Sequence, residues 1–211
     1  MTRDDADILR RGLAAFAELG YQGTTVRELA KRLGVSHNYV NDRYGSKEQF
    51  WRAVVDFGIA GHVADLMASF EQTDDVDVLR AVVTRWFTLA AGTPEANRII
   101  AEESVRDSTR LDYLAEKYTR RFWGELAPVI QRLMDSGRMP QVPLLLVFVA
   151  LNGPALALTH QNMHNRLGSA LPDTDEGRIR MAEQLAQLVV GGLVTSGPGR
   201  QEVPARTSPD S

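Results

Sequence analysis

A chain of 211 residues with 44% hydrophobic side chains is long enough to bury a sizeable core, as one compact domain or two small ones. It contains no cysteine, which excludes disulfide bonds and cysteine-ligated zinc and favours a reducing compartment. The formal net charge of −3 excludes a general attraction to nucleic acid, so any DNA binding must come from a local face.

Local signals near the N-terminus predict two helices in quick succession. Apolar residues at helical spacing indicate a first amphipathic helix that stops at Gly20. Thr25 and Glu28 then form a capping box, in which the Thr25 hydroxyl accepts from the backbone near Glu28 and the Glu28 carboxylate reaches back. This box predicts a short second helix that runs to about Leu33.

A third and a fourth helix follow with little chain between them. Gly34 can take the left-handed conformation that ends the second helix, and Ser36 can cap a third helix over residues 37–44. A second capping box, Ser46 with Gln49, opens a longer fourth helix. The tight connection between the second and third helices is typical of a helix-turn-helix, whose second helix lies in the DNA major groove.

The rest of the chain also reads as helical, without a competing strand pattern. Asp, Gly and Pro residues, which favour turns, separate five segments that we predict to be helices: residues 78–91, 95–104, 111–136, 143–167 and 175–194. Pro128 should kink or split the helix 111–136, because it lacks an N–H and its ring clashes with the preceding turn. The tail 197–211 is rich in Pro, Gly and Ser and should be disordered.

Residues 8–56 carry a specific combination of short motifs: F-x-E-x-G-Y, T-T-V-x-x-L-A, L-G-V-S and Y-G-S-K-E. This stretch resembles the DNA-binding domain of TetR-family transcriptional regulators. The resemblance implies an all-α fold, with a three-helix DNA-binding domain containing the helix-turn-helix over residues 1–50 and a helical ligand-binding and dimerisation domain over residues 51–196. It also implies a ligand-inducible repressor that binds a palindromic operator as a homodimer and releases it on binding a small apolar molecule.

The candidate DNA contacts lie in the second helix, the third helix and the start of the fourth. Amides near Thr25 can bind phosphate with help from the helix dipole, and Lys47 matches a lysine that contacts phosphate in the family. Val40 and Tyr44 should face the core, although the Tyr44 hydroxyl could also reach phosphate. The predicted DNA-binding set is Thr25, Ser36, His37, Asn38, Tyr39, Asn41, Asp42, Arg43 and Lys47.

Three positions of the third helix depart from the family pattern and leave the operator sequence open. Asn38 stands where a small residue is usual, Asn41 where tyrosine is usual, and Asp42 with Arg43 where aromatic or histidine side chains are common. A carboxylate at position 42 is repelled by phosphate unless it accepts from a cytosine amino group or pairs with an arginine.

Aromatic residues in the predicted body helices lie on elements that surround the ligand cavity in the family, although most aromatic residues at helical spacing are simply core. The polar stretch 159–165 could supply the polar part of a cavity or a dimer contact. His160 and His164 have the spacing of two zinc ligands, but Gln161 replaces the glutamate of H-E-x-x-H, so we expect neither metal nor cofactor. The predicted ligand-binding set is Trp86, Phe87, Tyr118, Phe122, Trp123, Asn152 and His160.

The predicted partners are a double-stranded DNA operator, a small hydrophobic effector and a second copy of the chain. The last two long helices are more apolar than the outer wall of a monomer needs, and in the family they form the dimer interface. Gly191 and Gly192 would permit close approach of another backbone, or would mark a frayed helix end.

Two further function classes were weighed against this reading. No phosphate loop, nucleophile motif or metal cluster indicates an enzyme. A helical ligand-binding or interaction protein of the same fold, without repressor activity, stays an alternative. The N-terminus lacks the features of an export signal and the apolar run 144–158 is too short to cross a membrane, so we expect a cytoplasmic protein without a membrane partner.

Overall fold

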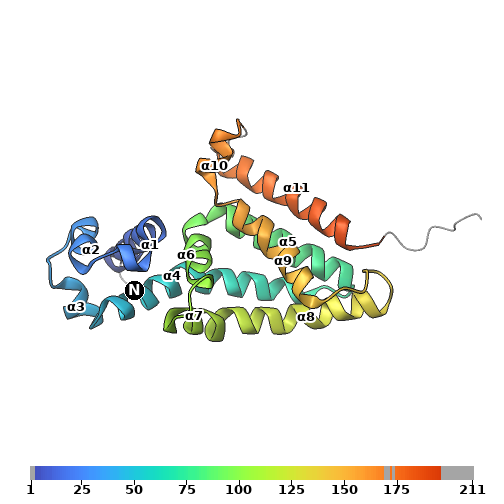
Figure 1. Cartoon of the computed structure of the whole chain (residues 1–211), viewed down its shortest axis with the longest axis horizontal. Coiled ribbons are helices and arrows are strands. Elements are labelled where there is room, and N and C mark those ends of the chain that lie inside the picture. The colour runs from blue at the N-terminus through green and yellow to red at the C-terminus, as the bar shows by residue number, and fades with distance from the viewer. Residues whose placement is uncertain (1–2, 169–171, 173, 196–211) are drawn as a thin grey trace, which may run out of the picture.

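The computed structural model describes residues 3–168, 172 and 174–195, and the regular elements within them are all helical (Figure 1). The predicted all-α fold class is therefore confirmed. The tail 197–211 lies outside the described residues. The helices are α1 (Arg3–Gly23), α2 (Val26–Leu33), α3 (Tyr39–Tyr44), α4 (Lys47–Ala68), α5 (Asp75–Gly92), α6 (Pro94–Ser104), α7 (Thr109–Leu114), α8 (Arg120–Asp135), α9 (Leu144–Ala157), α10 (Gln161–Arg166) and α11 (Asp175–Leu193). A 3-10 turn, η1 (Ser69–Glu71), follows α4, and a π-helical turn, η2 (Ala115–Thr119), joins α7 to α8.

Helices α1 to α3 and the start of α4 form one end of the molecule, which we call the head (Figure 1). Its core holds Phe16, Leu29 and Val40 together with Phe50, all almost completely buried. The same hydrophobic cluster continues into the neighbouring helices through residues of α6 and α7. The head is therefore packed against the neighbouring helices through a shared hydrophobic core and is not a separate domain joined by a flexible linker.

The remaining helices form the body, in which α11 packs along α5 and α8 packs against α5 (Figure 1). Helix α4 runs from the head into the body and contributes buried residues to both hydrophobic clusters, Trp51 to the first and Leu66 to the second. The boundary predicted between residues 50 and 51 thus falls inside α4. Among the described residues, the segment Lys47–Glu71 is long and apolar enough to cross a membrane by length and composition alone, which is weak evidence for a membrane span.

The prediction of one helix over 143–167 was wrong, because α9 ends at Ala157 and a separate helix follows. The Thr159 hydroxyl donates to the carbonyl of Leu156 (2.8 Å). The Thr159 carbonyl accepts from the Arg98 guanidinium of α6 (3.1 Å), so it is engaged by a tertiary contact instead of a further helical turn. Helix α10 begins only after this break.

The helix predicted over 111–136 is also interrupted, but not at Pro128. Pro128 lies inside α8, where its exposed position leaves the unpaired carbonyl of residue 124 accessible to water. The interruption is the π-helical turn, residues 115–119, which directly precedes α8. Such turns insert an extra residue and change which side chains face inward.

Candidate functional site

Helix α2 is held in place by its cap and by ion pairs to α1. The Thr25 hydroxyl accepts from the Glu28 N–H (3.1 Å), as predicted. The Glu28 carboxylate does not reach back to close the box. It accepts instead from Arg32 (2.9 Å), whose guanidinium also pairs with Glu18 of α1 (2.6 Å). Gly34, with φ of 71°, ends α2 in the left-handed conformation that its sequence position predicts.

Helix α3 begins later than predicted, at Tyr39, and Asn38 occupies its N-cap position without a side-chain cap. Ser36 was expected to cap this helix with its hydroxyl, but its backbone carbonyl accepts from the Tyr39 N–H instead (3.1 Å). His37 and Asn38 therefore lie in the turn that precedes α3. The hydrogen bond from the Tyr39 N–H to the Ser36 carbonyl closes this turn, and α3 starts at its last residue.

Most of the predicted DNA contacts are exposed to solvent. Tyr39 is an exception, because it is half-buried, with its ring centroid 6.5 Å from that of Tyr44. On the inner side, Val40 is completely buried and the Tyr44 ring lies 4.8 Å from Phe50, which confirms their predicted packing. The exposed members are Thr25, Ser36, His37, Asn38, Asn41, Asp42 and Arg43.

Lys47 has a structural partner that the sequence did not reveal. Its ammonium donates to the carbonyls of Tyr21 (2.8 Å) and Thr24 (2.9 Å) at the end of α1, and it lies 4.0 Å from the centre of the Tyr21 ring. Burial lowers the pKa of this lysine. Two of its three N–H bonds are thus used within the head, and one remains for a phosphate.

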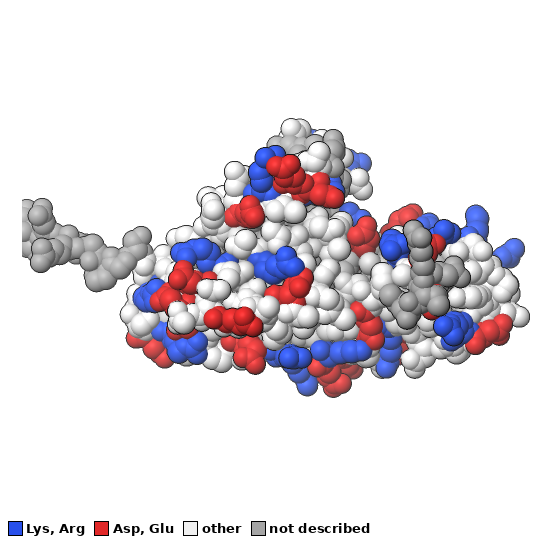
Figure 2. Space-filling view, turned by 180° about the vertical axis from the view of Figure 1, so that it is seen from behind, with Lys and Arg blue, Asp and Glu red and all other residues white. Residues whose placement is uncertain are grey.

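Charge near α3 is balanced rather than concentrated. Arg43 pairs with Asp5 of α1 (3.5 Å) instead of with its neighbour Asp42. Across the described residues on the face in Figure 2, acidic and basic side chains alternate without a continuous area of either sign. DNA binding by this head would therefore depend on the side chains and amides of α2 and α3.

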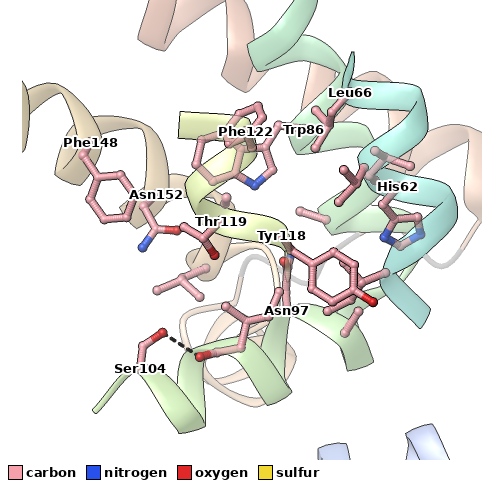
Figure 3. Close-up of a pocket in the computed structure, with 18 residues that line it drawn as sticks. His62, Leu66, Trp86, Asn97, Ser104, Tyr118, Thr119, Phe122, Phe148 and Asn152 are labelled. Carbon is pink, nitrogen blue, oxygen red and sulfur yellow. Dashed lines mark hydrogen bonds between the residues drawn. The ribbon is translucent and has the colours of Figure 1, made fainter. Parts of the chain in front are cut away.

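A cavity of about 160 Å³ lies in the body, within a partly open space of about 960 Å³. Its walls come from α4, α5, α6, the π-helical turn, α8 and α9 (Figure 3). The aromatic part consists of Trp86, Tyr118, Phe122 and Phe148, with the ring centroids of Trp86 and Phe122 5.2 Å apart in edge contact. This is the shape and chemistry of a small-molecule site.

Four of the seven predicted ligand-binding residues line this cavity: Trp86, Tyr118, Phe122 and Asn152. The other three do not line it. Phe87 is completely buried in the body core, and the Trp123 ring packs against Phe148 at 5.2 Å without lining the cavity. Each follows a lining aromatic by one residue, a rotation of about 100° on a helix, and so faces another way. His160 is exposed at the start of α10.

The polar lining residues His62, Asn97, Ser104 and Thr119 were missed from the sequence. Burial lowers the pKa of His62, which keeps its imidazole neutral, and its Nε2 lies 3.2 Å from the Thr93 hydroxyl. The amide nitrogen of Asn97 is buried without a hydrogen-bond partner. The spacing of Asn97 and Ser104, two turns apart on α6, is the signal that could have revealed them.

A hydrogen-bonded cluster connects the cavity wall to α4. Tyr118 donates to the Asp56 carboxylate (2.5 Å), which also accepts from Tyr113 (2.7 Å) and from Lys117 (2.7 Å). Burial raises the pKa of Asp56, but the hydrogen bonds from Lys117 and the two tyrosines outweigh it and hold the pKa below its ordinary value. Asp56 is thus a carboxylate that ties the π-helical turn to α4.

The arrangement around His164 differs from that of a metal ligand. Its Nε2 lies 2.9 Å from the carbonyl of Ala157, within hydrogen-bonding distance. Among the described residues, no group of three or more His, Asp or Glu side chains could hold a metal ion. The expectation of a protein without a metal or cofactor stays a prediction.

Comparison with known proteins decides the class of the head. The family described as "Bacterial regulatory proteins, tetR family" matches residues 8–54. This match places residues 8–54, which form most of the head, in the TetR family. One relative, the "Uncharacterized HTH-type transcriptional regulator YezE" of Bacillus subtilis (strain 168), is 32% identical over 73 residues, which cover 35% of this chain and 38% of the relative. The similarity thus spans well under half of the length of that relative.

Solved structures extend the likeness in fold to the body. HlyIIR, a hemolysin II transcriptional regulator, is 19% identical with a TM-score of 0.68, over 92% of this chain and 99% of that one. The ketosteroid transcriptional regulator KstR2 of Mycobacterium tuberculosis is 19% identical with a TM-score of 0.69, over 92% and 96% of the two chains. These relatives are named as regulators, in agreement with the expectation that the chain is not an enzyme.

Proposed function

We propose that the protein is a ligand-inducible repressor in the cytoplasm, which binds a palindromic operator as a homodimer and releases it when a small apolar molecule enters the body cavity. The observation that carries this proposal is one helix, α4, which begins beside the helix-turn-helix and ends at the cavity. Its N-terminal Ser46 and Lys47 belong to the head, whereas His62 and Leu66 line the cavity. A ligand can therefore act on the head through α4.

Contacts to DNA would divide into positioning and reading groups. The amides at the start of α2, beside Thr25, suit a phosphate because the helix dipole favours an anion there. The exposed side chains of the turn and of α3 suit base edges, above all Asn38 and Asn41, whose amides can pair with adenine. Lys47 would add a phosphate contact with the N–H that the head leaves free.

A second copy of the chain is supported by apolar side chains on the outer faces of the last long helices. Leu145 of α9 is 68% exposed, and Leu188 of α11 is 74% exposed. A Cβ atom added at Gly191 or Gly192 would meet nothing within 4 Å, so α11 leaves room there for another backbone. An exposed apolar patch of this kind is typical of an interface.

Release follows from the different affinities of two arrangements of α4 for the operator. Dimeric helix-turn-helix proteins seat two recognition helices about 34 Å apart, so a shift of a few ångström per subunit prevents both from binding. The Tyr118–Asp56 hydrogen bond connects the cavity wall to α4 and would transmit such a shift.

The test begins with duplexes selected from a random pool by the purified chain, followed by fluorescence-anisotropy titration. We expect a roughly palindromic site bound by a dimer. Asn38→Ala should change the sequence preference, whereas Lys47→Ala should weaken binding to all sequences and reduce the salt dependence by about one phosphate contact. Gln131→Ala, at an exposed position of α8, is the matched control.

Two results would overturn the proposal. One is a chain that stays monomeric at micromolar concentration. The other is equal affinity for selected and random duplexes, which would favour the alternative of a ligand-binding protein of the same fold without repressor activity.

A further inference from the structure

The cavity accepts an uncharged molecule. Its lining residues include no Asp, Glu, Lys or Arg, and burial keeps the imidazole of His62 neutral. A net charge placed in such a site would lose its hydration without gaining a partner. Complementarity therefore excludes a carboxylate or an ammonium group as the part of the ligand that enters.

The size of the cavity limits the part of the ligand that fits inside it. A dry apolar cavity of about 150 Å³ holds a benzene ring. The cavity in the body measures about 160 Å³ and is walled by the rings of Trp86, Phe122 and Phe148. One ring with a short substituent fits there, and the partly open space around it leaves room for more of the molecule.

One polar atom of the lining is fully buried without a hydrogen bond. The Ser104 hydroxyl donates to the carbonyl of Ile100 (2.7 Å), and Tyr118 donates to Asp56 (2.5 Å). The buried amide nitrogen of Asn97, by contrast, has no partner. Figure 3 places Asn97 on α6 at the cavity, between residues of α4 and α9. A buried donor without an acceptor is costly and needs an explanation.

We propose that the ligand of this cavity is an uncharged single-ring compound whose acceptor oxygen receives an N–H of Asn97. Rotation of the Asn97 side-chain amide would point its N–H into the cavity, and the aromatic side chains of the lining would enclose the ring of the ligand. The inference rests on the proposed function, because it specifies the chemistry of the effector. It adds a residue and a ligand class that the likeness in fold does not supply.

The test is isothermal titration calorimetry on the full chain without DNA, at a pH of about 7.5, where imidazole is neutral. Three probes of similar size differ in the relevant property: acetophenone has a neutral acceptor, ethylbenzene has none, and benzoate is charged. We expect acetophenone to bind about tenfold tighter than ethylbenzene, because a site with a buried donor rejects the analogue that lacks the acceptor. Benzoate should bind more weakly than acetophenone.

Two variants assign the preference to one side chain. Asn97→Leu should abolish the difference between acetophenone and ethylbenzene while both still bind. Asn152→Leu, at the other amide of the lining, is the matched control and should preserve it. Circular dichroism of each variant checks folding.

Three results would overturn the inference: tighter binding of benzoate than of acetophenone, no binding of any probe, or a preference that Asn152→Leu abolishes and Asn97→Leu keeps. Operator affinity is measured separately by anisotropy. If acetophenone binds as expected but leaves operator affinity unchanged, the proposed release fails and the inferred recognition stands. If the probes fail while the operator still binds, the inference alone fails.

Discussion

The ion pair between Glu103 of α6 and Arg110 of α7 gives a sharp test of how the head is joined to the body. Glu103 is 2% exposed and Arg110 is 7% exposed, and the Arg110 Nε donates to the Glu103 carboxylate over 2.8 Å. The other carboxylate oxygen accepts from Ser108 (2.9 Å). The Arg110 guanidinium lies 3.8 Å from the centre of the Tyr21 ring at the end of α1.

Glu103→Leu should destabilise the protein strongly, because it leaves the Arg110 charge buried without its partner. Removal of one partner of a buried pair costs about 3–5 kcal/mol. For a chain of this size, each kcal/mol lowers the melting temperature by about 2–4 °C, so we expect a decrease of roughly 6–20 °C in thermal unfolding followed by circular dichroism.

The double variant Glu103→Leu with Arg110→Leu should recover most of this loss, because replacement of both charges by apolar side chains is often neutral. Glu176→Leu is the matched control, since its pair with Arg180 is largely exposed and should contribute less than about 1 kcal/mol. If the double variant melts as low as the single one, the loss comes from packing, and the reasoning from an unpaired charge is refuted.

Three further predictions concern titration and core packing. Burial holds the pKa of His62 below its unfolded value of about 6.5. The folded protein with neutral His62 is therefore most stable above about pH 6.5, and it loses stability as the pH falls below that value and the unfolded chain takes up the proton more readily. His62→Gln should therefore flatten the decline of melting temperature between about pH 7.5 and 5.5, and an unchanged slope would contradict it. The hydrogen bond from Arg138 lowers the pKa of Asp74 to about 2, so the contribution of this carboxylate is present above its unfolded value and lost as the pH falls toward about 2. The Asp74→Asn variant should have a lower melting temperature than the wild type at neutral pH, and the difference should shrink as the pH is lowered. A difference that does not depend on pH would show that the loss does not come from the charge of Asp74. Leu126 is completely buried in α8, and Leu126→Ala should cost about 2–5 kcal/mol in urea unfolding, a loss that an exposed control such as Gln131→Ala should not show.

The helices of the head were predictable because their signals are local. Thr25 and Ser46 each accept from the backbone three residues on, and Gly34 has the positive φ that its place after α2 requires. The start of α5 was placed too late because Asp74, which caps it by accepting from Val76 and Asp77, was not recognised. Short-range hydrogen bonds of this kind depend on a few neighbouring residues, and so a sequence displays them.

The cavity could be predicted only in part, because its lining depends on how distant segments pack. Aromatic residues in the body were correctly expected to include cavity residues, but periodicity could not separate Trp86 from its neighbour Phe87. The π-helical turn that places Tyr118 and Thr119 in the wall has no sequence signature in the patterns used. The break at Thr159 likewise depends on Arg98, 61 residues earlier in the chain.

Gly20 lies where α1 meets α6, with φ of 69° and ψ of 167°. A Cβ atom at this position would stand 2.1 Å from a carboxylate oxygen of Glu102, well inside van der Waals contact. A side chain there would strain the backbone, because φ of 69° with ψ of 167° is open essentially only to glycine, and it would displace the Glu102 carboxylate from this joint between the head and the body. In a genetic screen for lost repression, substitutions at Gly20 would therefore score like changes in the reading helix or the effector site, although they alter neither surface. Under the proposed function, the backbone at this joint would be a third determinant of operator fit, separate from base contacts and from ligand affinity.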